Sequence, residues 1–168
     1  MLSEDVPEHY RHRQPRFVEA KVLVSVGRDH HGRDALLAPQ AAIAWSRMVA
    51  AATTDGITLL LISAFRSVAR QTEIVTRKRA RGFSWDEILG SSAYPGFSEH
   101  HTGCAVDVAS PKCPTLIEEF EHTPEFAWLT DNALQFGFRM SYPRDNPLGV
   151  IFEPWHWMWK SEAPALPS

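Results

Sequence analysis

The sequence predicts an α+β fold in which a mostly antiparallel sheet is flanked by helices. Two observations carry this prediction: apolar residues recur at helical spacing in several segments, and short apolar runs bounded by turn residues lie between them. At 168 residues the chain can bury a core of its own, and it contains no internal repeat, linker or low-complexity segment. We therefore expect a flexible N-terminal arm over residues 1–16 and one domain over residues 17–168.

Short apolar runs between turn signals predict the strands. These runs cover residues 20–26, 57–64, 104–109, 138–142 and 155–159. The run at 57–64 is apolar almost throughout, which is typical of a strand buried on both faces. The last run carries tryptophan at every second position, so one face of that strand is expected to be buried.

Periodicity and capping residues predict the helices. These cover residues 37–53, 68–81, 84–90 and 123–135. Pro39 is tolerated in the first turn of its helix, where an N–H group would have no partner within the helix. Ser84 and Glu87 have the spacing of a capping box. Gly82 and Gly137 follow predicted helices and are expected to end them.

Charge and hydropathy exclude several classes of partner. A formal net charge of −3 leaves no excess of basic residues to neutralise phosphates, which argues against nucleic acid and anionic lipid. No apolar run approaches the roughly 20 residues needed to cross a bilayer, so we expect no membrane association. Residues 1–17 carry charges throughout and lack the apolar segment of a Sec signal peptide. We expect a monomer that is cytoplasmic or exported by a non-Sec route.

The two cysteines, Cys104 and Cys113, lack the spacing of a structural zinc site. Because no export signal is found, free thiols are favoured over a disulfide. If residues 104–109 form a strand, Cys104 points away from Asp107 and towards the core. We therefore do not assign Cys104 as a nucleophile.

Two short stretches together supply the side chains of a metal site. Residues 98–107 offer an imidazole at His100 and a carboxylate at Asp107, and residues 153–157 offer a second imidazole at His156. Two nitrogens and one oxygen leave a tetrahedral Zn²⁺ with an open fourth position for water. This layout is typical of a catalytic zinc site rather than a structural one. The sequence therefore predicts a hydrolase with one zinc ion.

The predicted strands point the ligands and further charged groups towards one place. Ala105 shares a face with Asp107 and keeps that face clear, while alternation points His156 away from the neighbouring tryptophans. Glu153 precedes a proline, which cannot donate to a sheet ladder, so Glu153 should lie just outside the strand and accept a proton from the water. Arg66 follows the buried strand, where its planar charge suits an oxyanion or a substrate carboxylate.

Other aromatic and histidine side chains have less specific interpretations. The tryptophans of residues 155–159 are expected in the core, although Trp155 could instead line a substrate wall. His101 would point away from the site in an extended segment, so we expect it at the surface or behind the ligands. His30 and His31 lie in a loop without ligand-like spacing and are expected at the surface.

A set of spaced motifs occurs in order along the chain. Residues 98–107 match Ser-x-His-x-x-Gly-x-Ala-x-Asp in full, and residues 153–156 match Glu-x-Trp-His. Upstream, residues 65–71 match Tyr-Arg-Ser-x-x-x-Gln with Phe65 in place of tyrosine. Over about residues 20–160 the chain resembles the VanY-like D-alanyl-D-alanine carboxypeptidases, in a wider group with lysostaphin-type enzymes and the hedgehog signalling domain.

This resemblance implies a zinc metallopeptidase domain of the hedgehog or D-Ala-D-Ala peptidase type, acting on a peptidoglycan stem peptide or muropeptide. It implies zinc ligands at His100, Asp107 and His156. It further implies Glu153 as the general base and Arg66 as the group that stabilises the transition state. Candidate contacts for a substrate carboxylate or amide are Ser98, Ser67 and Gln71. Phe65 lacks the phenol that could bind substrate, so it bears on fine specificity.

The resemblance implies a D,D- or L,D-carboxypeptidase that removes a terminal D-alanine. An endopeptidase that cuts inside the stem, as a lysin does, is an alternative. A non-catalytic zinc module is a further alternative, but Glu153 and Arg66 argue against it because a binding module needs no proton acceptor beside the metal. Zinc is inferred from ligand type, and Mn²⁺ or Co²⁺ could bind the same donors.

Overall fold

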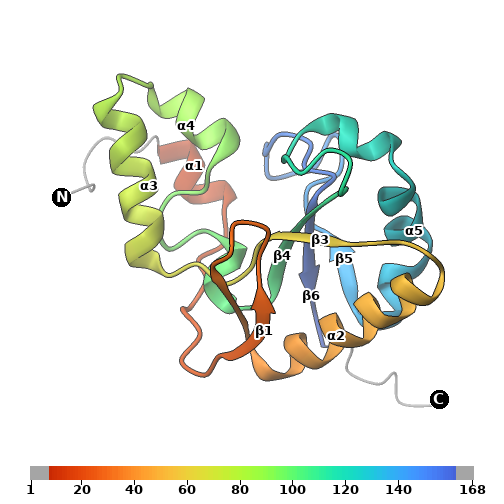
Figure 1. Cartoon of the computed structure of the whole chain (residues 1–168). Helices are drawn as coiled ribbons and strands as arrows, with labels where there is room; N and C mark the ends of the chain where they lie inside the picture. Colours follow the sequence, from red (N-terminus) through yellow and green to blue (C-terminus); the bar gives the residue numbers. More distant parts are fainter. Residues whose placement is uncertain (1–7, 162–168) are drawn as a thin grey trace, which may run out of the picture.

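The computed structural model describes residues 8–161, which form two parts (Figure 1). The helices are α1 (Glu8–Arg13), α2 (Pro39–Thr54), α3 (Val68–Ala80), α4 (Trp85–Ser91) and α5 (Pro124–Asn132), with 3-10 helices η1 (Glu99–Thr102), η2 (Glu118–His122) and η3 (Ala133–Phe136). The strands are β1 (Val24–Arg28), β2 (Asp34–Leu37), β3 (Leu60–Ser63), β4 (Ala105–Ala109), β5 (Phe138–Met140) and β6 (His156–Trp159). One part holds the main sheet with α2 and α5, and the other holds α1, α3 and α4 (Figure 1).

The main sheet has four strands in the order β3-β4-β6-β5, and each neighbouring pair is antiparallel. β1 and β2 form a separate antiparallel hairpin. The predicted α+β fold with an antiparallel sheet is therefore confirmed. Within the sheet, Asp107 on β4 lies directly opposite His156 on β6. The strand register thus brings the two predicted ligand motifs together.

One face of the main sheet carries the hydrophobic core. Val106 on β4 is paired with Trp157 on β6, and both are buried in the core cluster. Apolar side chains at helical spacing on α2 complete this cluster, namely Ala41, Trp45, Met48 and Ala52. Because side chains alternate along a strand, Asp107 and His156 face the other side of the sheet. The predicted burial of Trp157 in the core is confirmed.

The hairpin near the N-terminus differs from the prediction. The strand expected at 20–26 begins at Val24 and extends to Arg28. β2 lies where the sequence predicts a loop and the start of a helix. Its Ala35 and Leu37 are buried on alternate positions, but a strand of four residues is too short to show a clear period.

The predicted helices are present with shifted ends. The capping box of Ser84 and Glu87 is formed at the start of α4, which continues past Gly90 by one residue. The helix expected at 123–135 is divided into α5 and η3. Gly137 then adopts a left-handed conformation with φ 83°, and a Cβ atom there would lie 2.8 Å from Trp159 Nε1. Glycine is therefore required at this helix end both by the backbone conformation and by the lack of space.

The described part of the expected N-terminal arm lies against the domain, because the Tyr94 N–H donates to the Tyr10 hydroxyl and the Gln14 amide nitrogen donates to the Leu148 carbonyl, each at 2.9 Å. After α1, the Phe17 N–H donates to the Gly96 carbonyl at 2.9 Å. The Ala20 N–H donates to the His101 carbonyl at 2.8 Å. Residues 17–20 therefore follow the loop that leads into η1, whereas residues 1–7 lie outside the described part of the chain.

Two other expectations concern cysteines and membranes. Cys104 and Cys113 are free thiols, as predicted. Within residues 8–161, none of the helices has the length and apolar character needed to span a bilayer.

Candidate active site

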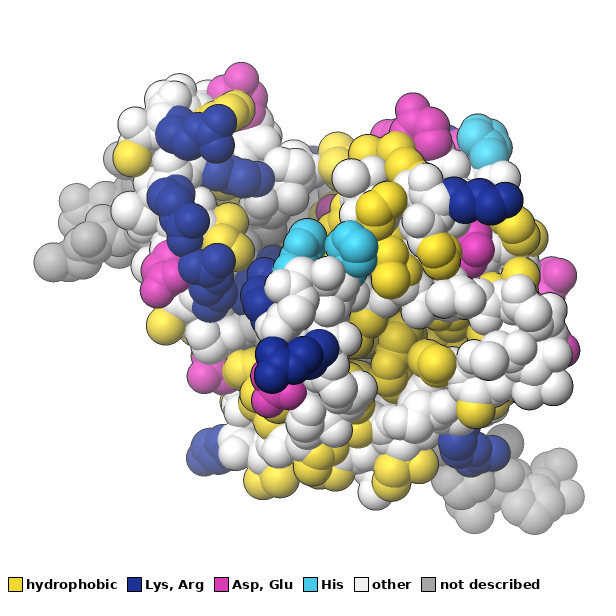
Figure 2. Space-filling view, viewed as in Figure 1, with side chains coloured by type: hydrophobic (Ala, Val, Ile, Leu, Met, Phe, Trp, Pro, Cys, Tyr) yellow, Lys and Arg dark blue, Asp and Glu magenta, His cyan; other side chains and the backbone are white. Residues whose placement is uncertain are grey.

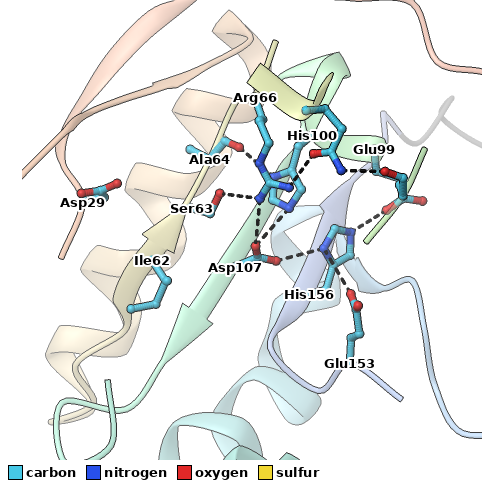
Figure 3. A network of polar contacts seen from close by, with 12 residues as sticks. Asp29, Ile62, Ser63, Ala64, Arg66, Glu99, His100, Asp107, Glu153 and His156 are labelled. Carbon is cyan, nitrogen blue, oxygen red and sulfur yellow. Dashed lines mark hydrogen bonds and ion pairs between the residues drawn. The ribbon is translucent and has the colours of Figure 1, made fainter. Parts of the chain in front are cut away.

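Side chains from separate parts of the chain meet on the open face of the sheet. His100 on η1, Asp107 on β4 and His156 on β6 place one ligand atom each within 4.8 Å of one another, and all are buried. Figure 3 shows Asp107 between the two imidazoles. The structure thus brings together the predicted ligand set.

His100 is oriented by the turn that carries it. Its Nδ1 lies 2.7 Å from the Ala64 carbonyl oxygen, and since a carbonyl can only accept, Nδ1 is the protonated nitrogen. Nε2 then faces Asp107 Oδ2 at 3.1 Å with its lone pair available. Gly103 ends η1 with φ 68°, and a Cβ there would lie 2.9 Å from the backbone nitrogen of Ala38. The motif glycine is therefore needed to bring η1 close to the start of α2.

His156 is held by a carboxylate that the sequence does not single out. Its Nδ1 lies 3.0 Å from Asp107 Oδ1, and its Nε2 lies 2.8 Å from Glu99 Oε2. The Ser141 hydroxyl donates to the same oxygen of Glu99, whose side chain is 9% exposed. A carboxylate that accepts from the far nitrogen of a ligating histidine fixes its tautomer and orientation. Strand alternation does not predict that Glu99 faces His156, because η1 is helical.

The electrostatics of this cluster suit a cation. Burial would raise the pKa of Asp107, but the charges and hydrogen bonds of the two histidines hold that pKa far below its usual range. Burial would lower the pKa of His156, but its bonds to Asp107 and Glu99 outweigh this effect and raise the pKa to about 10. The site therefore stabilises positive charge at His156 and beside Asp107, whereas burial lowers the pKa of His100 and favours its neutral form, which can donate a lone pair to a metal ion. An N₂O donor set with this property fits a divalent zinc ion.

Glu153 lies beside the cluster, just before β6. Its Oε2 is 3.9 Å from His156 Nδ1, and its backbone N–H donates to the Tyr142 carbonyl at 3.1 Å. Pro154 is fully buried and separates Glu153 from the strand, as the sequence predicts. Burial raises the pKa of Glu153 to about 7, with Asp107 and Glu99 adding to the effect while His156 and Arg66 oppose it. A carboxyl group with such a pKa can both accept and release a proton near neutrality.

Arg66 reaches the cluster from the end of β3. Its Nη2 lies 3.8 Å from Asp107 Oδ2 and donates to the Ser63 hydroxyl at 3.1 Å. Its Nη1 donates to the Gln71 Oε1 at 3.0 Å. Burial lowers the pKa of Arg66, but the guanidinium remains a fixed positive charge at the edge of the site.

His101 holds the backbone of Arg66 through a hydrogen bond. It is fully buried, with Nδ1 2.6 Å from the Arg66 carbonyl and Nε2 accepting from the Gly96 N–H at 3.1 Å. The surface alternative for His101 is therefore wrong, and the position behind the ligands is confirmed. The reason is that η1 turns the chain, whereas the parity argument assumes an extended segment.

A cleft passes over the cluster. A hollow of about 410 Å³ is lined by Glu153, His156 and Trp155, and it extends to Tyr10 on α1 and to Gln14 just after this helix. A second hollow of about 340 Å³ shares Arg66 and Asp107 with the first and extends to the β1–β2 hairpin. Figure 2 shows the surface hollowed between the two parts of the molecule, with Lys and Arg side chains gathered over α3.

Comparison with known families decides what this arrangement is. The family model described as VanY, D-alanyl-D-alanine carboxypeptidase, matches residues 34–162. This match includes every residue of the cluster, with Glu153 and Arg66. The chain belongs to this family.

Two curated relatives in this family are longer than this chain. YodJ of Bacillus subtilis, named as a carboxypeptidase, is 36% identical over 70% of this chain and 44% of its own length. The D-alanyl-D-alanine carboxypeptidase of Enterococcus faecalis is 32% identical over 64% of this chain and 42% of its own length. The chain therefore spans less than half of these two curated relatives.

Solved structures share the VanY-type fold. The LdcB LD-carboxypeptidase is 30% identical with a TM-score of 0.76, covering 86% of this chain and 71% of that one. A vancomycin resistance D,D-pentapeptidase VanY, in complex with Zn(II), is 27% identical with a TM-score of 0.62, covering 92% and 82%.

The side chains predicted to contact substrate in this VanY family member fall into two groups: two line the cleft, and two are bonded to other protein groups. Ser98 and Trp155 line the cleft. The Ser67 hydroxyl accepts from the Arg70 N–H and caps α3. Gln71 is fully buried, with one amide atom bound to Arg66 and the other to the Ala93 carbonyl. Gln71 thus holds Arg66 in place, and direct contacts of these residues with substrate stay predictions.

His30 and His31 lie in the β1–β2 connection, and both are exposed, as predicted. Figure 2 shows a pair of histidine side chains over this hairpin, near the hollow. Neither belongs to the ligand cluster.

Proposed function

We propose that this chain is a zinc-dependent carboxypeptidase that hydrolyses the bond before the terminal D-alanine of a peptidoglycan stem peptide. One observation carries the proposal: a largely buried carboxyl group, Glu153, and a fixed positive charge, Arg66, flank the donor set of two imidazoles and Asp107. Membership of the VanY family and the names of the relatives support the reaction class.

The proposed metal is one zinc ion held by His100, Asp107 and His156. The nitrogen and oxygen donors and the attraction of the site for positive charge support it. A related VanY structure contains Zn(II). When bound, zinc polarises the scissile carbonyl and lowers the pKa of the attacking water.

The chain's own residues supply the remaining chemistry. Glu153, with a pKa of about 7, accepts a proton from the water and passes it to the leaving amine. Arg66 stabilises negative charge on the carbonyl oxygen, because its guanidinium is held by Ser63 and Gln71 and does not need to reorganise. Trp155 supplies an apolar wall for the substrate.

Both D,D- and L,D-carboxypeptidase activity are compatible with these groups. The relatives include a D-alanyl-D-alanine carboxypeptidase and an LD-carboxypeptidase. The residue before the scissile bond separates them, since a pentapeptide stem ends in two D-alanines and a tetrapeptide stem ends in one. We therefore propose the step that both activities share, which is release of the terminal D-alanine.

The test uses the zinc-loaded chain with defined tetra- and pentapeptide stems. Mass spectrometry of the products should show loss of one D-alanine from at least one stem. Absence of release from every stem, with one zinc per chain confirmed, would overturn the proposal. Clearing of intact sacculi without free D-alanine would favour an endopeptidase instead.

A further inference from the structure

The segment around α1 connects the two walls of the cleft. On one side, the Tyr94 N–H donates to the Tyr10 hydroxyl at 2.9 Å, and the Tyr10 ring packs edge-on against Phe97. On the other side, the Gln14 amide nitrogen donates to the Leu148 carbonyl at 2.9 Å. Tyr94 follows α4, whereas Leu148 lies in the loop before β6. Tyr10 and Gln14 both line the larger hollow, so α1 forms a wall across its end.

The two ends of the cleft differ in exposure. At the α1 end, Gln14 is 9% exposed and donates to the Leu148 carbonyl, while Ile151, which also lines the larger hollow, is 42% exposed. At the hairpin end, the smaller hollow is lined by Arg33 and Arg70, whose side chains are 56% and 46% exposed. The bridge made by Tyr10 and Gln14 therefore blocks the cleft at α1, whereas no such bridge between described residues crosses the hairpin end, which carries exposed side chains.

The position of Glu153 indicates which part of a peptide enters the closed end. Glu153 lines the larger hollow but is absent from the lining of the smaller one. The group that takes a proton from water must deliver it to the leaving amine, so the leaving residue lies on the Glu153 side. The acyl part of the substrate then lies over Asp107 and Arg66 and leaves past the hairpin.

We propose that α1 closes the leaving-group end of the cleft, so that Tyr10 and Gln14 restrict hydrolysis to the ends of peptide chains. This inference rests on the proposed function and deepens it. A short terminal residue fits in front of the wall, whereas a leaving group that continues as a second peptide would collide with α1. Tyr10 and Gln14 thus act as specificity-determining residues.

The test compares two peptides with the same scissile bond. One is a stem with a free terminal D-alanine, and the other carries a lysyl peptide joined by an amide to that D-alanine. The wild-type chain should prefer the free end by at least about a hundredfold in kcat/KM. The double variant Tyr10→Ala/Gln14→Ala should reduce this preference at least tenfold. The matched control Ile43→Ala, an exposed position on α2, should keep it.

A binding measurement tests the same inference without a substitution in α1. In the zinc-loaded Glu153→Gln variant, calorimetry should show that the extended peptide binds at least tenfold more weakly than the free-ended stem. Equal affinities, or equal wild-type cleavage of both peptides, would overturn this inference while leaving the proposed function intact. A folded double variant with the wild-type preference would also overturn it. Cleavage of neither peptide by the zinc-loaded wild type would instead overturn the proposed function.

Discussion

The two parts of the molecule hold their side chains in different ways. In the sheet part, α2 buries a regular apolar stripe that includes Trp45 and Met48 against the core. In the other part, α3 buries only Gln71 and Val75, and α4 buries only Ile88. Hydrogen bonds and separate aromatic contacts connect that part, such as the bonds of Lys78 with Ser92 and of Tyr10 with Tyr94, and the packing of the Tyr10 and Tyr94 rings on Phe97.

This difference separates two requirements of the site. Asp107 and His156 come from strands backed by the apolar core, and a close-packed core of low compressibility resists their displacement. Arg66 and the wall at α1 depend on side-chain hydrogen bonds in the other part. We conclude that the core part secures metal binding and that the polar part sets charge placement and substrate fit. Substitutions in each part should therefore change different measured quantities.

Glu153→Ala should separate catalysis from metal binding most sharply. We expect kcat to fall about a thousandfold, because the proton acceptor is lost, while one zinc per chain remains. D-alanine release and elemental analysis measure the two quantities. Glu118→Ala, an exposed position on η2, is the matched control and should keep both. Unchanged turnover in Glu153→Ala would refute its role as the base.

The raised pKa of Glu153 should make the metal-free protein less stable at higher pH. The pKa moves from 4.5 to about 7, so the folded state is favoured below pH 4.5 and this contribution is lost as pH rises through about 7. The loss corresponds to about 3 kcal/mol. Glu153→Gln removes the ionisable group, so the metal-free variant should unfold at a higher temperature than the wild type at pH 8. At pH 4 the two should be similar; a constant difference at both pH values would contradict this account.

Glu99→Ala should weaken metal binding from within the core part. Loss of the bond to His156 Nε2 frees that imidazole, and we expect zinc affinity to fall about 10- to 100-fold. Competition with a chelator measures this affinity. Glu99→Gln keeps an acceptor oxygen and should recover part of the loss. Equal affinity in the wild type and Glu99→Ala would show that Glu99 does not position the ligand.

Gln71→Ala should affect only the polar part. Arg66 loses one partner for its guanidinium, and we expect kcat to fall about tenfold. Zinc affinity should stay at the wild-type value, because the ligands are backed by the other part. Thr72→Ala, next to it on α3, controls for helix stability and should retain activity. A parallel loss of zinc affinity in Gln71→Ala would break the division between the two parts.

The features that a local sequence pattern encodes could be predicted correctly. Asp107 and His156 sit on strands whose alternation is visible in the sequence, and Pro154 marks the place where Glu153 leaves the strand. The sheet and the meeting of these side chains could therefore be predicted. His101 and Glu99 could not, because η1 replaces an extended segment with a helical turn and changes which side chains face inward.

Long-range contacts account for most of what the sequence did not reveal. Gln14 binds a carbonyl 134 residues further along the chain, and no local pattern announces such a pairing. The strand β2 has only four residues and gains its place from pairing with β1. Both features depend on the assembled fold rather than on propensity.

The direct pairing of Asp107 with His156 has a mechanical consequence. A cation bound by both side chains would link β4 to β6 at this one residue pair. β5 is the outermost strand beyond β6, so its attachment depends on the same fastening. Removing the ion would then loosen the edge of the sheet before it disturbs α2. The catalytic metal would therefore also stabilise the fold.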